Sequence, residues 1–160
     1  MTPLHRLRHL STRFFGVLAT TPLGPAEQEL VNKALTAEQS RLFWEQDPID
    51  QRHAFDVFRR VEERLSGDGE AATAALLHDV GKRHSDVGAV GRSLATVLDA
   101  IHLPLPGDWR RYRDHEALGA ADLEEIGAGE LVVAFARGRA GRPESVDPDV
   151  WDTLVAADDA

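Results

Sequence analysis

The sequence contains no cysteine and no long hydrophobic run, and each absence narrows the class of protein. Without Cys among its 160 residues, the chain forms no disulfide, thiolate zinc site or cysteine nucleophile. His, Asp and Glu are then the strong metal ligands. This composition fits a reducing compartment, so we expect a cytoplasmic protein. No apolar run approaches the length that a bilayer requires, so we expect no membrane partner.

Basic residues are also scarce. The chain has 18 Lys and Arg against 27 Asp and Glu, which gives a formal net charge of -9. A protein that binds duplex nucleic acid needs a basic surface to neutralise phosphates, so we expect no such partner. Small phosphorylated molecules are still compatible with the sequence if positive charge or a metal ion is concentrated at one place.

Apolar residues recur at helical spacing along the whole chain, and no stretch shows the sustained alternation of a strand. The sequence therefore predicts an all-α fold in one globular unit. Basic and apolar residues near the N-terminus look like a targeting signal, but their spacing favours a helix that packs on the core. The predicted helices cover 3–19, 26–35, 48–65, 70–79, 87–101, 115–126, 130–137 and 148–160, and a capping box at Thr36 and Gln39 predicts a further short helix that carries Leu42, Phe43 and Trp44.

An imidazole and a carboxylate, His78 and Asp79, stand side by side at the end of an apolar, Ala-rich run. A divalent cation accepts these two ligands together. We expect Gly81 to end the helix and let the backbone turn away, so that both side chains reach one ion. In the alternative interpretation, Asp79 caps a neighbouring helix and His78 is an ordinary polar helix terminus.

Two further polar residues lie on apolar helical stripes. His53 is aligned with Val57 and Val61, and Asp158 is aligned with Trp151 and Leu154. Taken singly, His53 would be a buried histidine bonded to a carbonyl, and Asp158 a solvated acid at a frayed helix end. A divalent cation between the helices would explain all the placements, because it would neutralise two carboxylates and bind two imidazoles.

His53, His78-Asp79 and Asp158 together resemble the H…HD…D pattern of the HD-domain metal-dependent phosphohydrolase superfamily. The resemblance covers residues 47–160 and implies an HD-type helical bundle. It does not cover residues 1–46, for which the helical spacing of apolar residues predicts N-terminal helices that pack on the core. The resemblance further implies that these four residues bind one divalent metal ion. Mn, Mg, Fe, Co, Ni and Zn all accept mixed nitrogen and oxygen ligands, so the sequence does not choose among them.

The resemblance also implies catalytic roles. Asp79 would orient a water activated by the metal, and Lys82 would approach the substrate phosphate. His115 resembles a further histidine that many members place at the start of a helix lining the cleft. It would bind phosphate, protonate the leaving oxygen or ligate a second metal; alternatively, it is a solvent-exposed residue at a helix start. An arginine among Arg52, Arg137 and Arg139 could add a fork-shaped phosphate contact.

Two features depart from the family pattern. Where members with two metals have a histidine pair, this chain has Phe135-Ala136-Arg137-Gly138-Arg139, so we expect one metal. A second metal site through His115, His102 or His84 is left open. The nucleotidase branch has a glutamate shortly after the doublet, and this chain has Gly81-Lys82-Arg83 there, which weakens a transfer of that substrate.

The sequence therefore predicts a phosphohydrolase that cleaves a nucleotide or another small phosphate ester. One alternative is a regulatory module that binds a metal or a nucleotide without turning it over. Another is a purely helical interaction domain with no metal. The sequence does not predict an oligomeric state.

Overall fold

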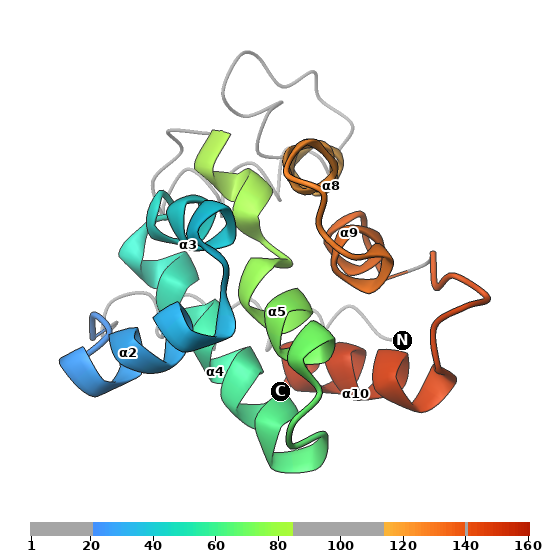
Figure 1. The fold of residues 1–160 in the computed structure, drawn as a ribbon, viewed down its shortest axis with the longest axis horizontal. Helices are drawn as coiled ribbons and strands as arrows, with labels where there is room; N and C mark the ends of the chain where they lie inside the picture. Colours follow the sequence, from blue (N-terminus) through green and yellow to red (C-terminus); the bar gives the residue numbers. More distant parts are fainter. Residues whose placement is uncertain (1–20, 85–113, 140) are drawn as a thin grey trace, which may run out of the picture.

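The computed structural model describes residues 21–84, 114–139 and 141–160, and these residues form helices without a strand (Figure 1). The all-α prediction is confirmed for this part of the chain. The predicted helices 3–19 and 87–101 lie outside the described residues. In chain order the elements are α2 (Pro25–Ala34), α3 (Ala37–Trp44), α4 (Pro48–Arg64), α5 (Gly69–Leu77), the 3-10 helix η1 (Val80–His84), α8 (His115–Glu125), α9 (Glu130–Ala136) and α10 (Pro148–Asp159).

Helix starts follow the local chemistry of the sequence. At α3 the Gln39 amide donates to Thr36 Oγ1 at 3.3 Å, and the Thr36 amide donates to Gln39 Oε1 at 2.9 Å. This is a capping box, which satisfies backbone donors that a helix start leaves unpaired. Pro48 and Pro148 each stand in a first turn, where a missing N–H costs no helical hydrogen bond.

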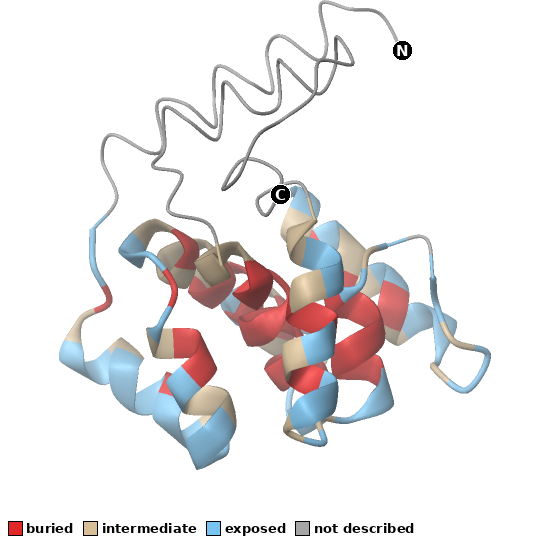
Figure 2. Ribbon diagram, turned by 90° about the horizontal axis from the view of Figure 1, so that it is seen from above, coloured by how far each residue is buried: buried red, intermediate tan, exposed pale blue. Residues whose placement is uncertain are grey.

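The central element is α5. Every residue from Ala71 to Leu77 is buried, and α5 contacts α2, α3, α4, α9 and α10. Figure 2 shows the buried residues concentrated in the middle of the molecule. Alanine side chains let neighbouring helices approach closely, so the residues that follow α5 also emerge in the interior. His78 and Asp79 are therefore buried, with 8% and 7% of their surfaces exposed.

The end of α5 differs from the prediction. The α-helix ends at Leu77 rather than Asp79, and the chain continues as the 3-10 helix η1. Gly81 lies inside η1, and it is not among the described glycines with positive φ, which are Gly67, Gly127 and Gly138. Its role is close packing instead. A Cβ at Gly81 would lie only 1.9 Å from the carbonyl oxygen of His115 in α8.

The N-terminal helices of the described region pack on the same core. Both α2 and α3 contact α5. The division into an N-terminal part, 1–46, and a metal-binding part, 47–160, stays a prediction.

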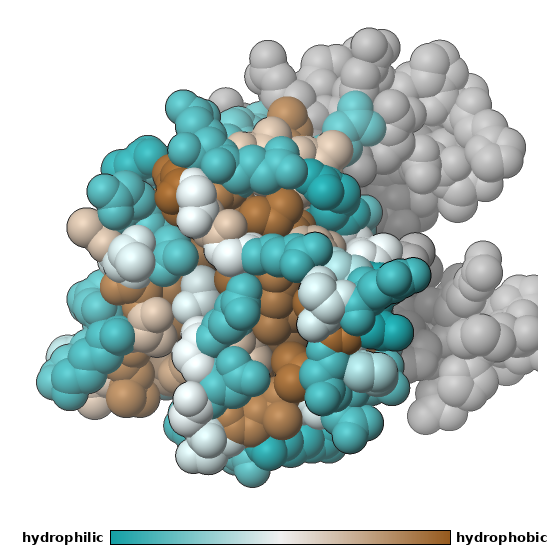
Figure 3. All heavy atoms as spheres, turned by 45° about the vertical axis from the view of Figure 1, so that its right-hand side comes forward, coloured by the Kyte–Doolittle hydropathy of each residue, from teal (hydrophilic) through white to brown (hydrophobic). Residues whose placement is uncertain are grey.

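The described surface is mainly polar. Figure 3 shows teal, hydrophilic side chains over much of one face, with apolar residues between them. Leu30 is the large hydrophobic residue that is exposed in the described region, at 44%. None of the described helices combines the length and hydrophobicity needed to cross a membrane.

Candidate metal centre

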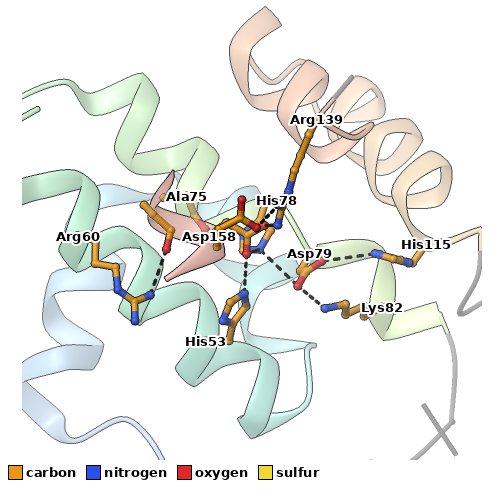
Figure 4. Close-up of polar contacts among 11 residues, drawn as sticks. His53, Arg60, Ala75, His78, Asp79, Lys82, His115, Arg139 and Asp158 are labelled. Carbon is orange, nitrogen blue, oxygen red and sulfur yellow. Dashed lines mark hydrogen bonds and ion pairs between the residues drawn. The ribbon is translucent and has the colours of Figure 1, made fainter. Parts of the chain in front are cut away.

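The four predicted ligands lie together, although they come from three parts of the chain (Figure 4). His53 comes from the middle of α4, His78 and Asp79 follow α5, and Asp158 comes from the last turn of α10. Both α4 and α5 contact α10. The helical stripes that carry His53 and Asp158 therefore meet beside the end of α5.

The distances are short enough for one ion to reach several of these residues. One ligand atom each from His53, His78 and Asp79 lies within 4.8 Å of the others. Asp158 is not one of those three, but its Oδ1 lies 2.9 Å from His53 Nε2 and 3.4 Å from His78 Nε2. The described residues thus hold a possible metal-binding triad, with Asp158 next to both of its imidazoles.

The orientation of His78 is fixed by the backbone. Its Nδ1 lies 2.9 Å from the carbonyl oxygen of Ala75. Because a carbonyl only accepts, Nδ1 must carry the proton. The other nitrogen, Nε2, is buried, has no hydrogen-bond partner, and lies 3.4 Å from both Asp79 and Asp158. A hydrogen bond from the non-ligating nitrogen to a carbonyl is the usual support of a metal-binding histidine.

A lone pair on Nε2 that faces two carboxylates needs a cation or a proton between them. Burial alone would lower the pKa of His78, but the negative charges of Asp79 and Asp158, each with an oxygen 3.4 Å from Nε2, outweigh burial and raise that pKa to about 10. A divalent cation would meet the same electrostatic demand and is accepted by imidazole and carboxylate together. The donor set therefore fits a divalent metal.

Asp79 is ionised despite its burial. Burial would raise the pKa of its carboxyl group, but Lys82, His78 and His115 hold that pKa well below its usual range. Its carboxylate therefore accepts hydrogen bonds and can ligate a cation near neutral pH. Because its pKa is low, it is a weak base.

The two other predicted catalytic residues, Lys82 and His115, both lie beside Asp79 (Figure 4). Lys82 Nζ forms an ion pair with Asp79 Oδ2. His115 Nε2 lies 3.5 Å from Asp79 Oδ1. The contact between Gly81 and α8 places His115 there, since the Gly81 backbone touches the His115 carbonyl. His115 is largely buried, with 18% of its side chain exposed, so it is not the fully exposed helix start of the alternative interpretation.

Asp158 has a second partner on its outer oxygen. Arg139, in the connection between α9 and α10, donates from Nη2 to Asp158 Oδ2 and from Nη1 to Asp159 Oδ1. Burial would raise the pKa of Asp158, but the hydrogen bond with His53 and the charges of His78 and Arg139 lower that pKa far below its usual range. Three arginines were equal candidates before the structure was known, because no spacing pattern distinguishes Arg139 from Arg52 and Arg137.

His84, which lies in η1, is one of the histidines considered for a second metal site. It does not contact the candidate metal centre and pairs with α8 instead. His84 Nε2 is 2.7 Å from Asp122 Oδ2, and Arg83 Nη2 is 3.0 Å from the same oxygen. These residues hold η1 against α8. His102 lies outside the described residues. Within the described ranges, one group of three side chains is arranged so that it could hold a metal ion, and it is formed by His53, His78 and Asp79.

Comparisons of the chain with protein-family models, with curated proteins and with solved structures find no match. The resemblance to HD-domain proteins therefore stays a prediction, and the function must be argued from the geometry of the site.

Proposed function

We propose that the protein is a metal-dependent phosphohydrolase of the HD type, which cleaves a nucleotide or another small phosphate ester with water as the nucleophile. The observation that carries the proposal is the buried Nε2 of His78, which makes no hydrogen bond and lies 3.4 Å from the carboxylates of both Asp79 and Asp158. His53 adds a second imidazole. Two imidazoles and two carboxylates around one point favour a divalent cation.

His53, His78 and Asp79 would hold the metal, with Asp158 as the fourth ligand. When bound, a divalent cation would supply Lewis-acid polarisation of the phosphoryl group and a lowered pKa of water. The protein's own contribution is to fix the ligands: Ala75 orients His78, and Arg139 holds the outer oxygen of Asp158. Phe135, which is buried, packs on the His78 ring with the centroids 5.9 Å apart and so helps to hold that ring in place.

Asp79 is the residue that orients the attacking water. Its low pKa makes it a hydrogen-bond acceptor and ligand rather than a strong general base. Lys82 neutralises Asp79 in the structure, and its ammonium group would also approach a non-bridging phosphate oxygen. His115, next to Asp79 Oδ1, would donate a proton to the leaving oxygen. We propose a cytoplasmic location, because a chain without Cys fits a reducing compartment.

The test is a hydrolysis assay on protein stripped of metal and reloaded with Mn²⁺ or another divalent cation. The panel contains a phosphate monoester, a phosphate diester and nucleoside monophosphates. We expect metal-dependent turnover that falls at least about 100-fold in Asp79→Ala. A matched control is Arg41→Gln, because Arg41 pairs with Glu45 on the surface and 59% of its side chain is exposed.

The same assay separates the enzyme from a regulatory module. Protein that binds one metal ion and is stabilised by it, but hydrolyses none of these esters, would be a binding module. Turnover that survives chelation, or that Asp79→Ala leaves intact, would contradict the proposed mechanism.

A further inference from the structure

Arg139 is a partly exposed side chain that contacts the candidate metal centre. Its guanidinium binds the outer oxygen of Asp158, whose inner oxygen faces the imidazoles of His53 and His78 (Figure 4). Gly138, directly before it, has φ of 118°, a conformation that L side chains rarely adopt. The backbone at Gly138 therefore turns the chain so that Arg139 reaches the end of α10.

The two other arginines considered from the sequence are engaged elsewhere. Arg52 donates to both carboxylate oxygens of Glu27, at 2.8 and 2.7 Å. Arg137 pairs with Glu124 at 2.5 Å, and 55% of each side chain is exposed. Of these three guanidinium groups, only that of Arg139 contacts a predicted metal ligand.

The charges around the centre favour an anion once a divalent cation is bound. With His78 neutral, three carboxylates (Asp79, Asp158 and Asp159) face two cationic side chains (Lys82 and Arg139). A divalent cation would turn this excess of negative charge into an excess of positive charge. Lys82 pairs with Asp79 and Arg139 pairs with Asp158. An anion bound to the metal would therefore have one cationic side chain beside each of these two carboxylates.

Arg139 also has donors left for a ligand. A guanidinium has five N–H groups, and 41% of the Arg139 side chain is exposed. The side chain lines a cavity of about 770 Å³ together with Glu116, Val133 and Gly138. This volume lies within the range of small-molecule sites. The lining includes none of the four predicted metal ligands, so Arg139, which pairs with Asp158, is the residue that connects the cavity with the candidate metal centre.

We propose that Arg139 is a substrate-binding residue, which binds the phosphoryl group of the substrate while the cavity receives the organic part. This inference rests on the proposed function, because it requires a divalent cation at the centre. The role is distinct from support of Asp158 alone: a supporting residue would affect the metal, whereas a binding residue affects the anion.

The experiment uses isothermal titration calorimetry in two steps, first Mn²⁺ into protein stripped of metal and then inorganic phosphate into the loaded protein. We expect Arg139→Gln to weaken phosphate binding at least about tenfold, and Mn²⁺ binding by less than about threefold. Arg139→Lys keeps the charge without the fork and should show an intermediate loss. Arg41→Gln, a surface arginine that does not line the cavity, is the control and should leave phosphate binding within about twofold of wild type.

The possible failures are distinguishable. Unchanged phosphate binding by Mn²⁺-loaded Arg139→Gln would overturn this inference and leave the proposed function standing. A loss of Mn²⁺ binding with normal phosphate binding at saturating Mn²⁺ would show that Arg139 only supports Asp158. Wild-type protein that binds no Mn²⁺ would overturn both proposals. If Arg139→Gln does not fold, phosphate affinity of Arg139→Lys equal to wild type would overturn the inference.

Discussion

The backbones of Gly81 and Gly119 touch, and this contact holds η1 against α8. A Cβ on Gly119 would lie 2.9 Å from the Gly81 nitrogen, and a Cβ on Gly81 would lie 1.9 Å from the carbonyl oxygen of His115. The two helices thus cross at a distance that only glycine permits, and the crossing places His115 beside Asp79.

Gly81→Ala should therefore destabilise the fold and move His115. Overpacking costs about 1–3 kcal/mol in the free energy of unfolding, and the clash here is with backbone, which cannot rotate away. The measurement is urea unfolding, with Gly69→Ala as control, because a Cβ at Gly69 meets nothing within 4 Å. Equal stability of Gly81→Ala and wild type would contradict the close contact.

The ion pair between Arg52 and Glu27 should make stability depend on acid. Arg52 hydrogen bonds, with a smaller contribution from the Gly24 amide, lower the pKa of Glu27 from 4.5 to about 2. Because the folded pKa is depressed, the stabilisation is complete above pH 4.5 and is lost as the pH falls through 2. Arg52 also donates to the Thr21 and Pro22 carbonyls, so the pair fastens the start of α2 to α4.

Glu27→Gln should cost about 1 kcal/mol in the free energy of unfolding at pH 7, because the pair is bidentate but partly exposed. The difference from wild type should shrink as the pH falls toward 2. Glu29→Gln is the control, since Glu29 pairs with Lys33 in solvent and should show no measurable change. If Glu27→Gln lowered the free energy of unfolding by the same amount at every pH, the ion pair between Arg52 and Glu27 would make no ionic contribution to stability.

Proton and metal should compete at His78. Its folded pKa, about 10, is above the ordinary value of 6.5, because Asp79 and Asp158 favour the imidazolium. In protein stripped of metal, this stabilisation is complete below pH 6.5 and is lost as the pH rises through 10. Metal binding must displace the proton, so metal affinity should rise by up to about tenfold per pH unit over this range.

Two measurements check the competition: urea unfolding in chelator, and Mn²⁺ titration, each from pH 6 to 9. Stability in chelator should fall as the pH rises, while Mn²⁺ affinity increases. His78→Gln should remove most of both slopes, although His53 retains its own imidazole. Slopes that are the same in His78→Gln and wild type would show that another group titrates.

The helices could be predicted from the sequence because their causes are local. Apolar spacing, the capping box at Thr36 and the prolines at Pro48 and Pro148 depend on residues within a few positions of one another. The change from α-helix to 3-10 helix after Leu77 was not predicted, because it accompanies the packing of Gly81 on the distant α8.

Part of the candidate site could also be predicted from local sequence patterns, and part could not. His53 and Asp158 were recognisable as polar residues on apolar stripes, and their meeting at His78 follows from the packing of α10 on α4 and α5. The contact of Arg139 with Asp158 had no such pattern. It depends on the positive φ of Gly138 and on where α10 ends, which are properties of the folded chain.

Neighbouring carboxylates at the end of α10 should differ sharply in their effect on metal binding. Asp158 contacts both imidazoles and its side chain is 8% exposed, whereas Asp159 pairs with Arg139 and is 61% exposed. Asp158→Asn should weaken Mn²⁺ binding at least about 100-fold, and Asp159→Asn by less than about threefold. Isothermal titration calorimetry checks this, and similar losses in the two variants would show that Asp158 is no ligand.

The most direct test is an anomalous difference map from crystals of the whole chain grown with Mn²⁺. We predict one peak, bonded to His78 Nε2 and Asp79 and shared with His53 and Asp158. No peak at this position with saturating Mn²⁺, or a peak bonded to other residues while His78 Nε2 keeps a proton, would contradict a metal centre here.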